Sequence, residues 1–385
     1  MDYDLSQEQE ILRKSVRDFA ENEIAPIAEE LSRNETFSTE LTKKMGEMGL
    51  FGCVVSPDYG GMGMDYLSYI IAVEELARVD GSQAATVAAG NSLGIGPIYY
   101  FGSEKQKQKY LPELCTGKKL WGFGLTEPEA GSDAGSSRTK AFLEAGYWTV
   151  NGSKIFITNA ANELSMGSTV QCITGKNSNG QKEYSCILVE NGTEGFEAKA
   201  MHKKMMWRAS NTAELYFDNV HVPEENILGK RGDGFRQMLS TLDAGRLSIG
   251  AMGLGCAQGA FEAAAKYASQ RKQFGKTIAS FQATQFKLAD MAMHIEAARN
   301  LLYKACWLKD NHKPYKAESA MAKLYCSEVA HEAANHCVQI HGGYGLMEEY
   351  PAEKFYRDQK LLEIGEGTSE VQRIVIARQV LDRYS

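Results

Sequence analysis

The segment YWTVNGSKIFIT, residues 147–158, lies in a strand-like stretch between two helical parts of this chain. Both halves of the segment are rich in aromatic and β-branched residues, which favour strands. Asn151-Gly152 lies between the halves, and both residues tolerate the positive φ that a tight turn needs. The segment therefore predicts a β-hairpin with its turn at residues 150–153.

Strand-like sequence continues after this segment. Residues 170–174 and 184–189 flank Asn177-Ser178-Asn179-Gly180, a run of residues typical of turns. Apolar and β-branched residues follow at 215–217 and 220–222, before Pro223. These segments together predict a small β domain in the middle of the chain.

Helical periodicity dominates the rest of the sequence. Ser6 and Gln9 have the spacing of a capping box at a helix start. Near the other end, one apolar stripe recurs at helical spacing and comprises Leu288, Met291, Ile295, Ala298 and Leu302. We therefore predict a multidomain α+β fold, with an N-terminal helical domain (1–120), a middle β domain (121–232) and a C-terminal helical bundle (233–385).

Length and composition limit the classes of function. A chain of 385 residues is too long for one ordinary core, and its net charge of −7 gives no footprint for nucleic acid. No run of about 18 apolar residues predicts a membrane span, and the N-terminus lacks the pattern of a signal or transit peptide. The eight cysteines include no Cys-x-x-Cys, so we expect reduced thiols in a cytoplasmic protein.

A possible zinc motif fails on spacing. His331 and His336 are five residues apart, which rotates them by about 140° around a helix and places them on different faces. The His-Glu-x-x-His motif needs a spacing of four. We therefore predict no metal site.

Two glycine-rich segments leave alternatives open. Residues 123–133 join the helical part to the β part, and their small and hydroxyl side chains suit either a flat ligand or an ordinary linker. Residues 339–345 suit either an anion-binding turn or a helix C-terminus that is capped by glycine. Spacing alone does not separate these readings.

Glu366 lies between two glycines, ahead of a helix whose apolar side includes Val371 and Ile374. A glutamate in a loop is usually a solvated surface residue. If this one reached into a pocket, desolvation would raise its pKa toward the range that a general base needs.

Several segments in this order resemble the acyl-CoA dehydrogenase family along essentially the whole chain. They are Leu125-Thr126-Glu127-Pro128 through Gly131-Ser132-Asp133, Asn151-Gly152-x-Lys154-x-x-Ile157-Thr158-Asn159, Arg271-Lys272-Gln273-Phe274-Gly275, and Glu366-Gly367-Thr368-Ser369 with Gln372-Arg373. The resemblance implies an acyl-CoA dehydrogenase-like fold with a β-barrel-like middle domain and a C-terminal four-helix domain. It also implies FAD, an acyl-CoA substrate, a homotetramer and electron-transfer flavoprotein as acceptor.

The resemblance also assigns roles to residues. It implies that Glu366 is the catalytic base, which removes the α-proton while flavin N5 accepts the β-hydride, giving the 2-enoyl-CoA. It places the substrate against Ser132, Asp243, Arg246 and Gly367. The implied FAD contacts, some from a neighbouring subunit, are Phe123, Leu125, Thr126, Gly131, Ser132, Phe156, Ile157, Thr158, Arg271, Phe274, Gln282, Gln339, Ile340, Gly342, Gly343, Thr368 and Glu370.

Departures from the family pattern bear on the base and the substrate. Some members carry the base just before the arginine that matches Arg246, where this chain has Gly245, so Glu366 keeps the role. Gly365 replaces a common tyrosine, which indicates either room for a branched or cyclic acyl group or simple variation. Met206 replaces a glycine, so we expect its loop to follow a different path.

Other functions are also compatible with parts of this sequence. An acyl-CoA oxidase would use the same flavin chemistry with oxygen as the acceptor, although such chains are usually much longer. A non-catalytic acyl-CoA-binding protein would keep the fold without bleaching a flavin.

Overall fold

The computed structural model describes residues 4–382 and 384. Residues 1–3, which belong to the N-terminal segment considered above, lie outside this description. The order of elements is helical, then β, then helical, which confirms the predicted fold class. None of the helices in the described part of the chain combines the length and apolar sequence that a membrane crossing needs.

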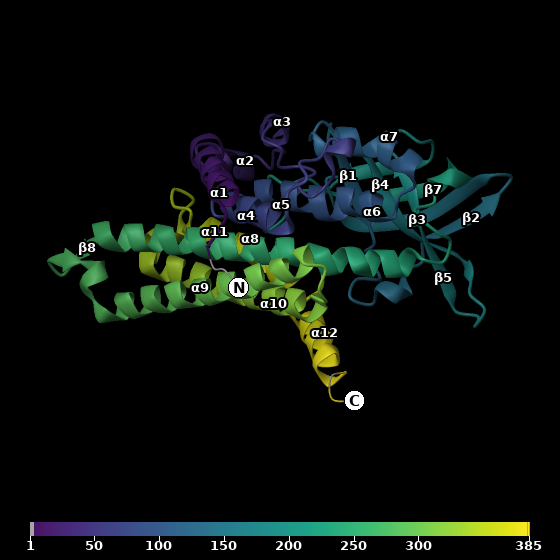
Figure 1. Ribbon diagram of the computed structural model, residues 1–385. Helices are drawn as coiled ribbons and strands as arrows, with labels where there is room; N and C mark the ends of the chain where they lie inside the picture. Colours follow the sequence, from purple (N-terminus) through teal and green to yellow (C-terminus); the bar gives the residue numbers. More distant parts are fainter. Residues whose placement is uncertain (1–3, 383, 385) are drawn as a thin grey trace.

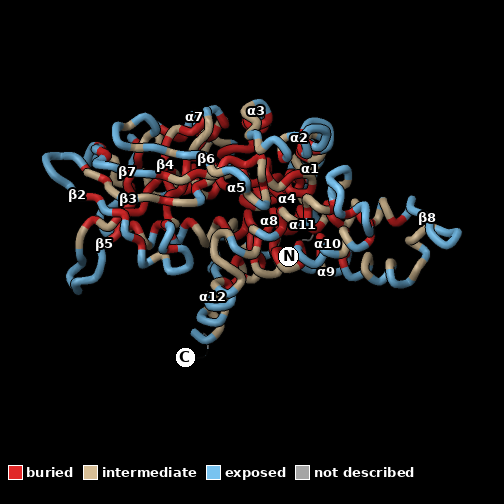
Figure 2. The backbone as a smooth tube through the Cα atoms, turned by 180° about the vertical axis from the view of Figure 1, so that it is seen from behind, coloured by how far each residue is buried: buried red, intermediate tan, exposed pale blue. Residues whose placement is uncertain are grey.

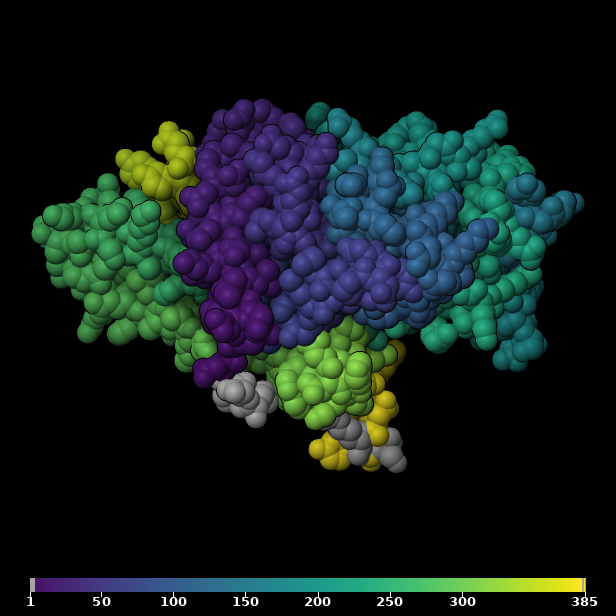
Figure 3. Space-filling model, turned by 45° about the horizontal axis from the view of Figure 1, so that its top comes forward, coloured from purple at the N-terminus to yellow at the C-terminus, as the bar shows by residue number. Residues whose placement is uncertain are grey.

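Short helices form the first part of the chain and cover one face of the molecule (Figure 3). Ser6 caps the first helix, and Gln9 returns a bond to the Ser6 backbone, so the predicted capping box is confirmed. The elements are α1 (Gln7–Phe19), η1 (Ala20–Ile24), α2 (Ala28–Arg33), α3 (Thr39–Glu47), η2 (Pro57–Tyr59), α4 (Tyr66–Ala77), α5 (Gly81–Ala89), η3 (Gly90–Ile95), α6 (Gly96–Phe101) and α7 (Glu104–Cys115).

A curled seven-stranded sheet follows, in the order β1-β4-β2-β3-β7-β6, with β5 paired to β4. Its interior is apolar and includes the buried side chains of Trp148, Val150 and Val170. The elements are β1 (Leu120–Gly124), η4 (Ala134–Ser136), β2 (Lys140–Glu144), β3 (Tyr147–Thr158), β4 (Ser165–Lys176), β5 (Lys182–Glu190), β6 (Phe196–Ala200), β7 (Thr212–Pro223) and η5 (Glu224–Asn226).

The hairpin predicted at residues 150–153 is wrong. β3 runs through these residues as one strand and pairs with β7, with a register shift between Val150 and Gly152. Gly152 has φ 141°, and a Cβ there would lie 2.6 Å from Thr139 Oγ1, so the glycine serves a bulge and a close approach. The chain reverses instead at Ala145 and Gly146, which both have positive φ.

The other turn prediction is confirmed. Asn177 begins the connection between β4 and β5, and its side-chain oxygen accepts bonds from the backbone N–H groups of Asn179 and Gln181 at 3.0 Å each. Gly180 has φ 75°, a conformation that glycine adopts readily. An asparagine and a glycine therefore close this hairpin as the sequence indicated.

Long helices form the last part of the chain and extend beyond the sheet and the N-terminal helices (Figure 1). Met291, Ile295, Ala298 and Leu302 are buried and Leu288 packs against the core, so the predicted stripe is confirmed. The elements are α8 (Gly234–Gln270), β8 (Lys272–Gln273), β9 (Lys276–Thr277), η6 (Ile278–Ser280), α9 (Gln282–Asp310), α10 (Lys316–His341), η7 (Gly342–Leu346), α11 (Ala352–Asp358), η8 (Gln359–Glu363) and α12 (Ser369–Leu381).

One hydrophobic core joins the two helical parts to one side of the sheet. Buried chain is concentrated where α4, α5 and α8 meet the sheet, whereas the β8 end and α12 are largely exposed (Figure 2). Ile374 and Leu381 on α12 are 50% and 66% exposed, so the apolar side of this helix lacks cover within one chain. The boundaries 1–120, 121–232 and 233–385 remain our proposal for the domains.

The contact between α8 and α4 depends on a glycine. A Cβ at Gly255 would overlap the backbone oxygen of Glu74. We expect Gly255→Ala to lower the free energy of unfolding by about 1–3 kcal/mol, because the backbones must separate. Urea unfolding followed by circular dichroism would measure this change.

Gly250→Ala on the same helix is the matched control. Its new Cβ would lie 3.1 Å from the end of the flexible Leu302 side chain, which can move. Alanine also favours helix over glycine by about 1 kcal/mol. Equal stability of the two variants would contradict the assigned backbone contact.

Candidate active site

Glu366 lies in the short connection between η8 and α12. Its φ is 52°, and that of Gly367 is 98°, so two successive residues have the left-handed conformation. The Thr368 side chain then caps α12 by accepting a bond from Val371 N at 3.3 Å. The chain therefore turns sharply at Glu366 before the helix begins, and this turn sets the direction of the carboxylate.

The Glu366 carboxylate packs directly against α8. A Cβ at Gly245 would overlap Glu366 Oε2, so only glycine leaves room for the acid in this position. Oε2 is buried and has no hydrogen-bond partner among the described residues. A buried acceptor without a partner is rare, and here it leaves a lone pair available to a proton.

Burial raises the pKa of Glu366 to about 7, while the positive charges of Lys323 and Arg246 oppose this rise. A general base works best when its pKa is close to the pH of the reaction. The carboxyl group is therefore suited to accept a proton near neutral pH.

The structure brings together the base and most of the predicted substrate residues. Asp243 and Arg246 form an ion pair of 2.5 Å on α8, and Arg246 is 4% exposed. The charge of Arg246 also acts on Glu366, so these groups share one site with Gly367. Ser132, in contrast, is an exposed residue on the loop that follows β1.

A buried ion pair fixes the start of that loop. Lys154 Nζ donates to Glu127 Oε1 at 2.7 Å and to the Leu125 backbone oxygen at 3.2 Å. The Lys154 side chain is 0% exposed, and Glu127 also accepts from the backbone N–H of Arg138 and Thr139. Burying such a pair is costly, and its geometry fixes the path of the chain around residue 126.

The predicted FAD residues of the β region are neighbours in space. Phe123 and Leu125 are both 8% exposed, and Thr126 O accepts a bond from Ile155 N at 2.9 Å. Next to this contact, Phe156 has φ 62° and its ring is 63% exposed, although Ile157 and Thr158 continue the strand. An exposed aromatic ring beside accessible backbone suits a flat ring system.

Gly131 lies at the open side of the same region. A Cβ at Gly131 would meet no atom within 4 Å, and Ser132 beside it is exposed. This loop therefore leaves space at the surface next to Thr126.

A second group of predicted FAD residues surrounds a cavity of about 630 Å³ near the β8 end of α8. Arg271 lies over the Tyr344 ring at 5.5 Å, and a Cβ at Gly342 or Gly343 would meet no atom within 4 Å. A guanidinium beside open glycine backbone fits the pyrophosphate of a dinucleotide. Other predicted contacts that line this cavity are Ile340, Gly342 and Gly343.

The remaining predicted FAD residues lie outside that lining. Phe274 is 93% exposed, and Gln282 and Gln339 are exposed as well. Thr368 is engaged as the cap of α12, and Glu370, two residues later, is exposed. The β8 end and the sheet lie at opposite ends of the molecule (Figure 1). One chain therefore does not gather all the predicted FAD residues around one ligand.

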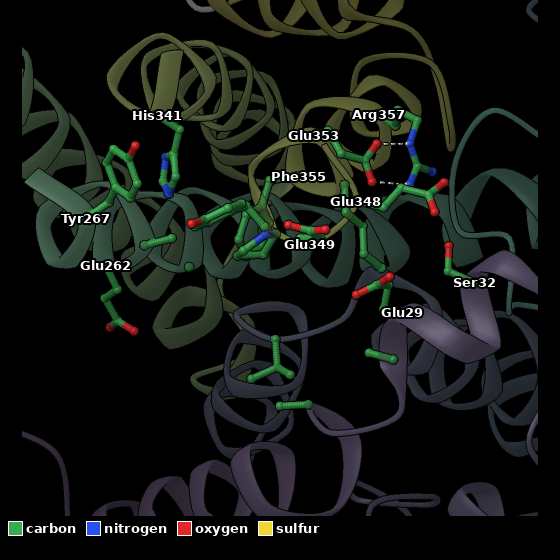
Figure 4. Close-up of a pocket in the computed structure, with 18 of the residues that line it drawn as sticks. Glu29, Ser32, Glu262, Tyr267, His341, Glu348, Glu349, Glu353, Phe355 and Arg357 are labelled. Atoms are coloured by element: carbon green, nitrogen blue, oxygen red, sulfur yellow. Dashed lines mark hydrogen bonds and ion pairs between the residues drawn. The ribbon is translucent and has the colours of Figure 1, made fainter. Parts of the chain in front are cut away.

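A separate cavity of about 610 Å³ lies between α2, α8 and the segment 348–357 (Figure 4). Its charged lining is largely paired within the chain, as in the bonds of Arg357 with Glu353 at 2.6 Å and of Arg33 with Glu348 at 3.1 Å. Neither Glu366 nor Arg246 lines it. A large cavity volume therefore does not mark the position of the candidate base.

Two residues that bond to the loop carrying Glu366 were not predicted as site residues: Lys323 was not singled out, and Gln372 was quoted in a motif without a role. The sequence did contain a pattern that marks Lys323. Lys323 lies in an alanine-rich helix and is spaced from Cys326 and Ala330 like a core residue. A single lysine in a core stripe is unusual and marks a candidate functional residue.

Met206 does not have the positive φ that a glycine could adopt there, in line with the expectation for this residue. Its neighbour Trp207, in contrast, has φ 43°. The unusual backbone therefore falls on Trp207, whose backbone N–H donates to Asp358 Oδ1 at 2.8 Å.

Comparison with known proteins identifies the family. The acyl-CoA dehydrogenase N-terminal, middle and C-terminal domain descriptions match residues 6–118, 122–220 and 232–381. A probable acyl-CoA dehydrogenase of Bacillus subtilis is 50% identical over 99% of this chain and 100% of its own.

Similar solved structures belong to the same family. The butyryl-CoA dehydrogenase from Megasphaera elsdenii has a TM-score of 0.95 at 43% identity, covering 99% of this chain and 100% of its own. A chain from a structure reported as the electron transferring flavoprotein of Acidaminococcus fermentans has a TM-score of 0.95 at 45% identity, with the same coverage.

These matches define a flavoprotein oxidoreductase that acts on acyl-CoA thioesters. The chain belongs to the acyl-CoA dehydrogenase family, whose members depend on FAD.

Gly245→Ala tests the contact between α8 and Glu366. We expect the new methyl group to displace the carboxylate and reduce kcat/KM by about 10²-fold, because small misplacements of reacting groups have effects of this size. Gly250→Ala, one turn and a half along the same helix, should leave turnover near that of the wild type. A folded Gly245→Ala enzyme with full activity would refute the contact.

Proposed function

We propose that this enzyme dehydrogenates a short acyl-CoA between its α and β carbons, with Glu366 as the base. The observation that carries the proposal is the buried Glu366 carboxylate, whose Oε2 has no partner and whose pKa is raised to about 7. The family supplies the substrate class and the cofactor. FAD, when bound, accepts the β-hydrogen as a hydride.

The chain contributes a proton acceptor that is held in place. Glu366 Oε2 takes the α-proton, which the adjacent thioester carbonyl makes acidic. A bond from the Glu366 backbone N–H to the thioester oxygen stabilises the developing enolate. α8 covers Oε2 and keeps water away from this oxygen. Asp243 and Arg246 border the same site and serve as substrate contacts.

We also propose that two copies of the chain share each FAD. Phe123, Leu125, Thr126, Gly131, Ser132 and residues 156–158 of one copy would hold the flavin end. The cavity lined by Arg271, Ile340, Gly342 and Gly343 of another copy would hold the pyrophosphate and adenosine, with Phe274, Gln282 and Gln339 nearby. Thr368 and Glu370, at the start of α12, would contact FAD from beside the Glu366 loop. The exposed Phe274, Phe286 and Ile374 side chains support association, and a homotetramer is the expected state.

The acyl group is proposed to be short. Tyr69 on α4 is 1% exposed, and its hydroxyl donates to Ala88 O at 2.8 Å, so the ring is fixed. Burial, together with the nearby Glu366 charge, raises the pKa of Tyr69, so the phenol stays neutral. A fixed aromatic ring near the base would limit the length of the acyl chain. The similarity to a butyryl-CoA dehydrogenase points the same way.

Electron-transfer flavoprotein is the proposed acceptor, supported by the similarity to a chain from an electron transferring flavoprotein structure. An oxidase would instead form hydrogen peroxide from acyl-CoA in air without another acceptor. A non-catalytic binding protein would bind acyl-CoA without losing flavin colour.

Glu366→Gln should leave the flavin bound but slow its bleaching by acyl-CoA by at least about 10²–10⁴-fold, the usual contribution of a general base. Stopped-flow absorbance under anaerobic conditions with butyryl-CoA would measure this rate. Glu332→Gln, an exposed position on α10, serves as the control and should bleach at the wild-type rate. Rapid bleaching of the flavin in Glu366→Gln would remove Glu366 from the proposed role.

Substrate length can be ranked directly. We expect kcat/KM for butyryl-CoA to exceed that for octanoyl-CoA by at least about tenfold, since each badly placed methylene costs on the order of 1 kcal/mol or more. Including isobutyryl-CoA and a cyclohexyl thioester tests whether Gly365 provides room for branched or cyclic groups. A preference for octanoyl-CoA would contradict the role given to Tyr69.

A further inference from the structure

A second buried charge lies beside the Glu366 loop. The Lys323 side chain on α10 is 0% exposed, and its Nζ donates to the Gly367 backbone oxygen at 2.8 Å. α8 and α10 pack closely at this point, since a Cβ at Gly250 would lie 3.7 Å from Lys323 Cα, an ordinary van der Waals contact. The ammonium group therefore reaches the loop from within the helical bundle.

The same carbonyl has a second donor. Gln372 Nε2 donates to Gly367 O at 2.8 Å and to Glu366 O at 3.3 Å, and Gln372 is 0% exposed. Lys323 and Gln372 together hold both carbonyl groups of a segment whose φ angles are positive at Glu366 and Gly367. These bonds offset the tendency of a non-glycine residue to leave that conformation.

The charge of Lys323 needs compensation as well. A neutral carbonyl does not offset the burial of an ammonium ion, which requires a negative charge nearby. The acids that act on Lys323 are Glu366, Glu363 and Glu370. Glu363 is bonded to Lys360 and Glu370 is exposed, so Glu366 is the acid that remains as a buried countercharge.

Other groups also face Glu366. Arg246 acts on it from α8, but Arg246 already pairs with Asp243 at 2.5 Å. Tyr69 on α4 interacts with it as a neutral phenol. Arg246 thus pairs with another carboxylate, whereas Lys323 donates its hydrogen bond to the loop that carries Glu366.

We infer that Lys323 is a positioning residue, which holds the Glu366 loop through the Gly367 carbonyl and favours the ionised carboxylate through its charge. This inference rests on the proposed role of Glu366 as base. It assigns two separable effects to one side chain, namely a hydrogen bond that fixes geometry and a positive charge that sets proton affinity.

The expected pH dependence of the reaction follows from the ionisation of Glu366 and Lys323. Glu366 has a pKa raised to about 7, so the base form is present above this pH and is lost as the pH falls through it. Burial lowers the pKa of Lys323 to about 8, so its charge is present below this pH. Between these values both groups are charged and stabilise one another. Removing the Lys323 charge should raise the pKa of Glu366 further.

The test is the pH dependence of flavin bleaching by butyryl-CoA in Lys323→Met and Lys323→Gln holoenzymes. We expect the acidic limb to move up by about 1–3 pH units in both variants, as for loss of an opposite charge a few ångströms away. At pH 6.5 the rate should fall at least about tenfold, with recovery above pH 9. Lys323→Gln should keep more of the maximal rate than Lys323→Met, because its amide can still donate to Gly367 O.

Exposed Lys304→Met on α9 is the matched control and should keep the wild-type pH profile. A role in folding alone would lower the rate equally at every pH. An unchanged acidic limb in either flavin-containing Lys323 variant would overturn the inference. If Glu366→Gln also bleached rapidly, the proposed base would fail; if it were inactive, only the role of Lys323 would fail.

A reciprocal measurement covers the case in which neither Lys323 variant retains flavin. Coupling between two titrating groups is equal in both directions. Glu366→Gln should therefore lower the pKa of Lys323 by about 1–3 units, as read from NMR of ¹³Cε-labelled lysine in the holoenzyme. An unchanged titration of the buried lysine would contradict the inference in that case.

Discussion

The burial of one carboxylate against a helix is the constraint on which the site depends. Glu366 Oε2 occupies the space that a side chain at position 245 would fill, so the carboxylate can take this position only when residue 245 is glycine. Burial alone would make the acid hard to ionise. The cations Lys323 and Arg246 limit that effect, and the left-handed turn at residues 366–367 directs the acid inward. Helices α8, α10 and α12 must therefore all be in place before the base can work.

Much of the fold could be predicted from sequence because local patterns and tertiary structure agree. The capping box at Ser6, the stripe from Met291 to Leu302 and the Asn177 turn all formed as expected. Asn151-Gly152 failed because the same φ freedom that suits a turn also suits a bulge. Only the pairing of β3 with β7 and the proximity of Thr139 distinguish these uses, and both are long-range facts.

The candidate site, like the fold, could be predicted from the sequence only in part. Glu366, Asp243 and Arg246 were found through the family resemblance, and the structure brings them together. Gln372 lies in the same short segment as Glu366, but the contribution of Lys323 depends on the packing of α10 against that loop, which no short segment encodes. The predicted FAD residues of the sheet and those near β8 lie far apart (Figure 1), because sequence motifs do not specify which residues meet in space.

The placement of Lys323 has a consequence for chemical reactivity. Substrates of this family are thioesters, which acylate amines, and the neutral amine is the reactive form. A lysine whose pKa is lowered to about 8 is partly neutral under ordinary conditions, so at an open site it would be a target for self-acylation. Here Lys323 is 0% exposed and its nitrogen donates to the Gly367 carbonyl of the loop that carries the acid. Burial and this hydrogen bond thus protect a nucleophilic nitrogen from acylation by a thioester.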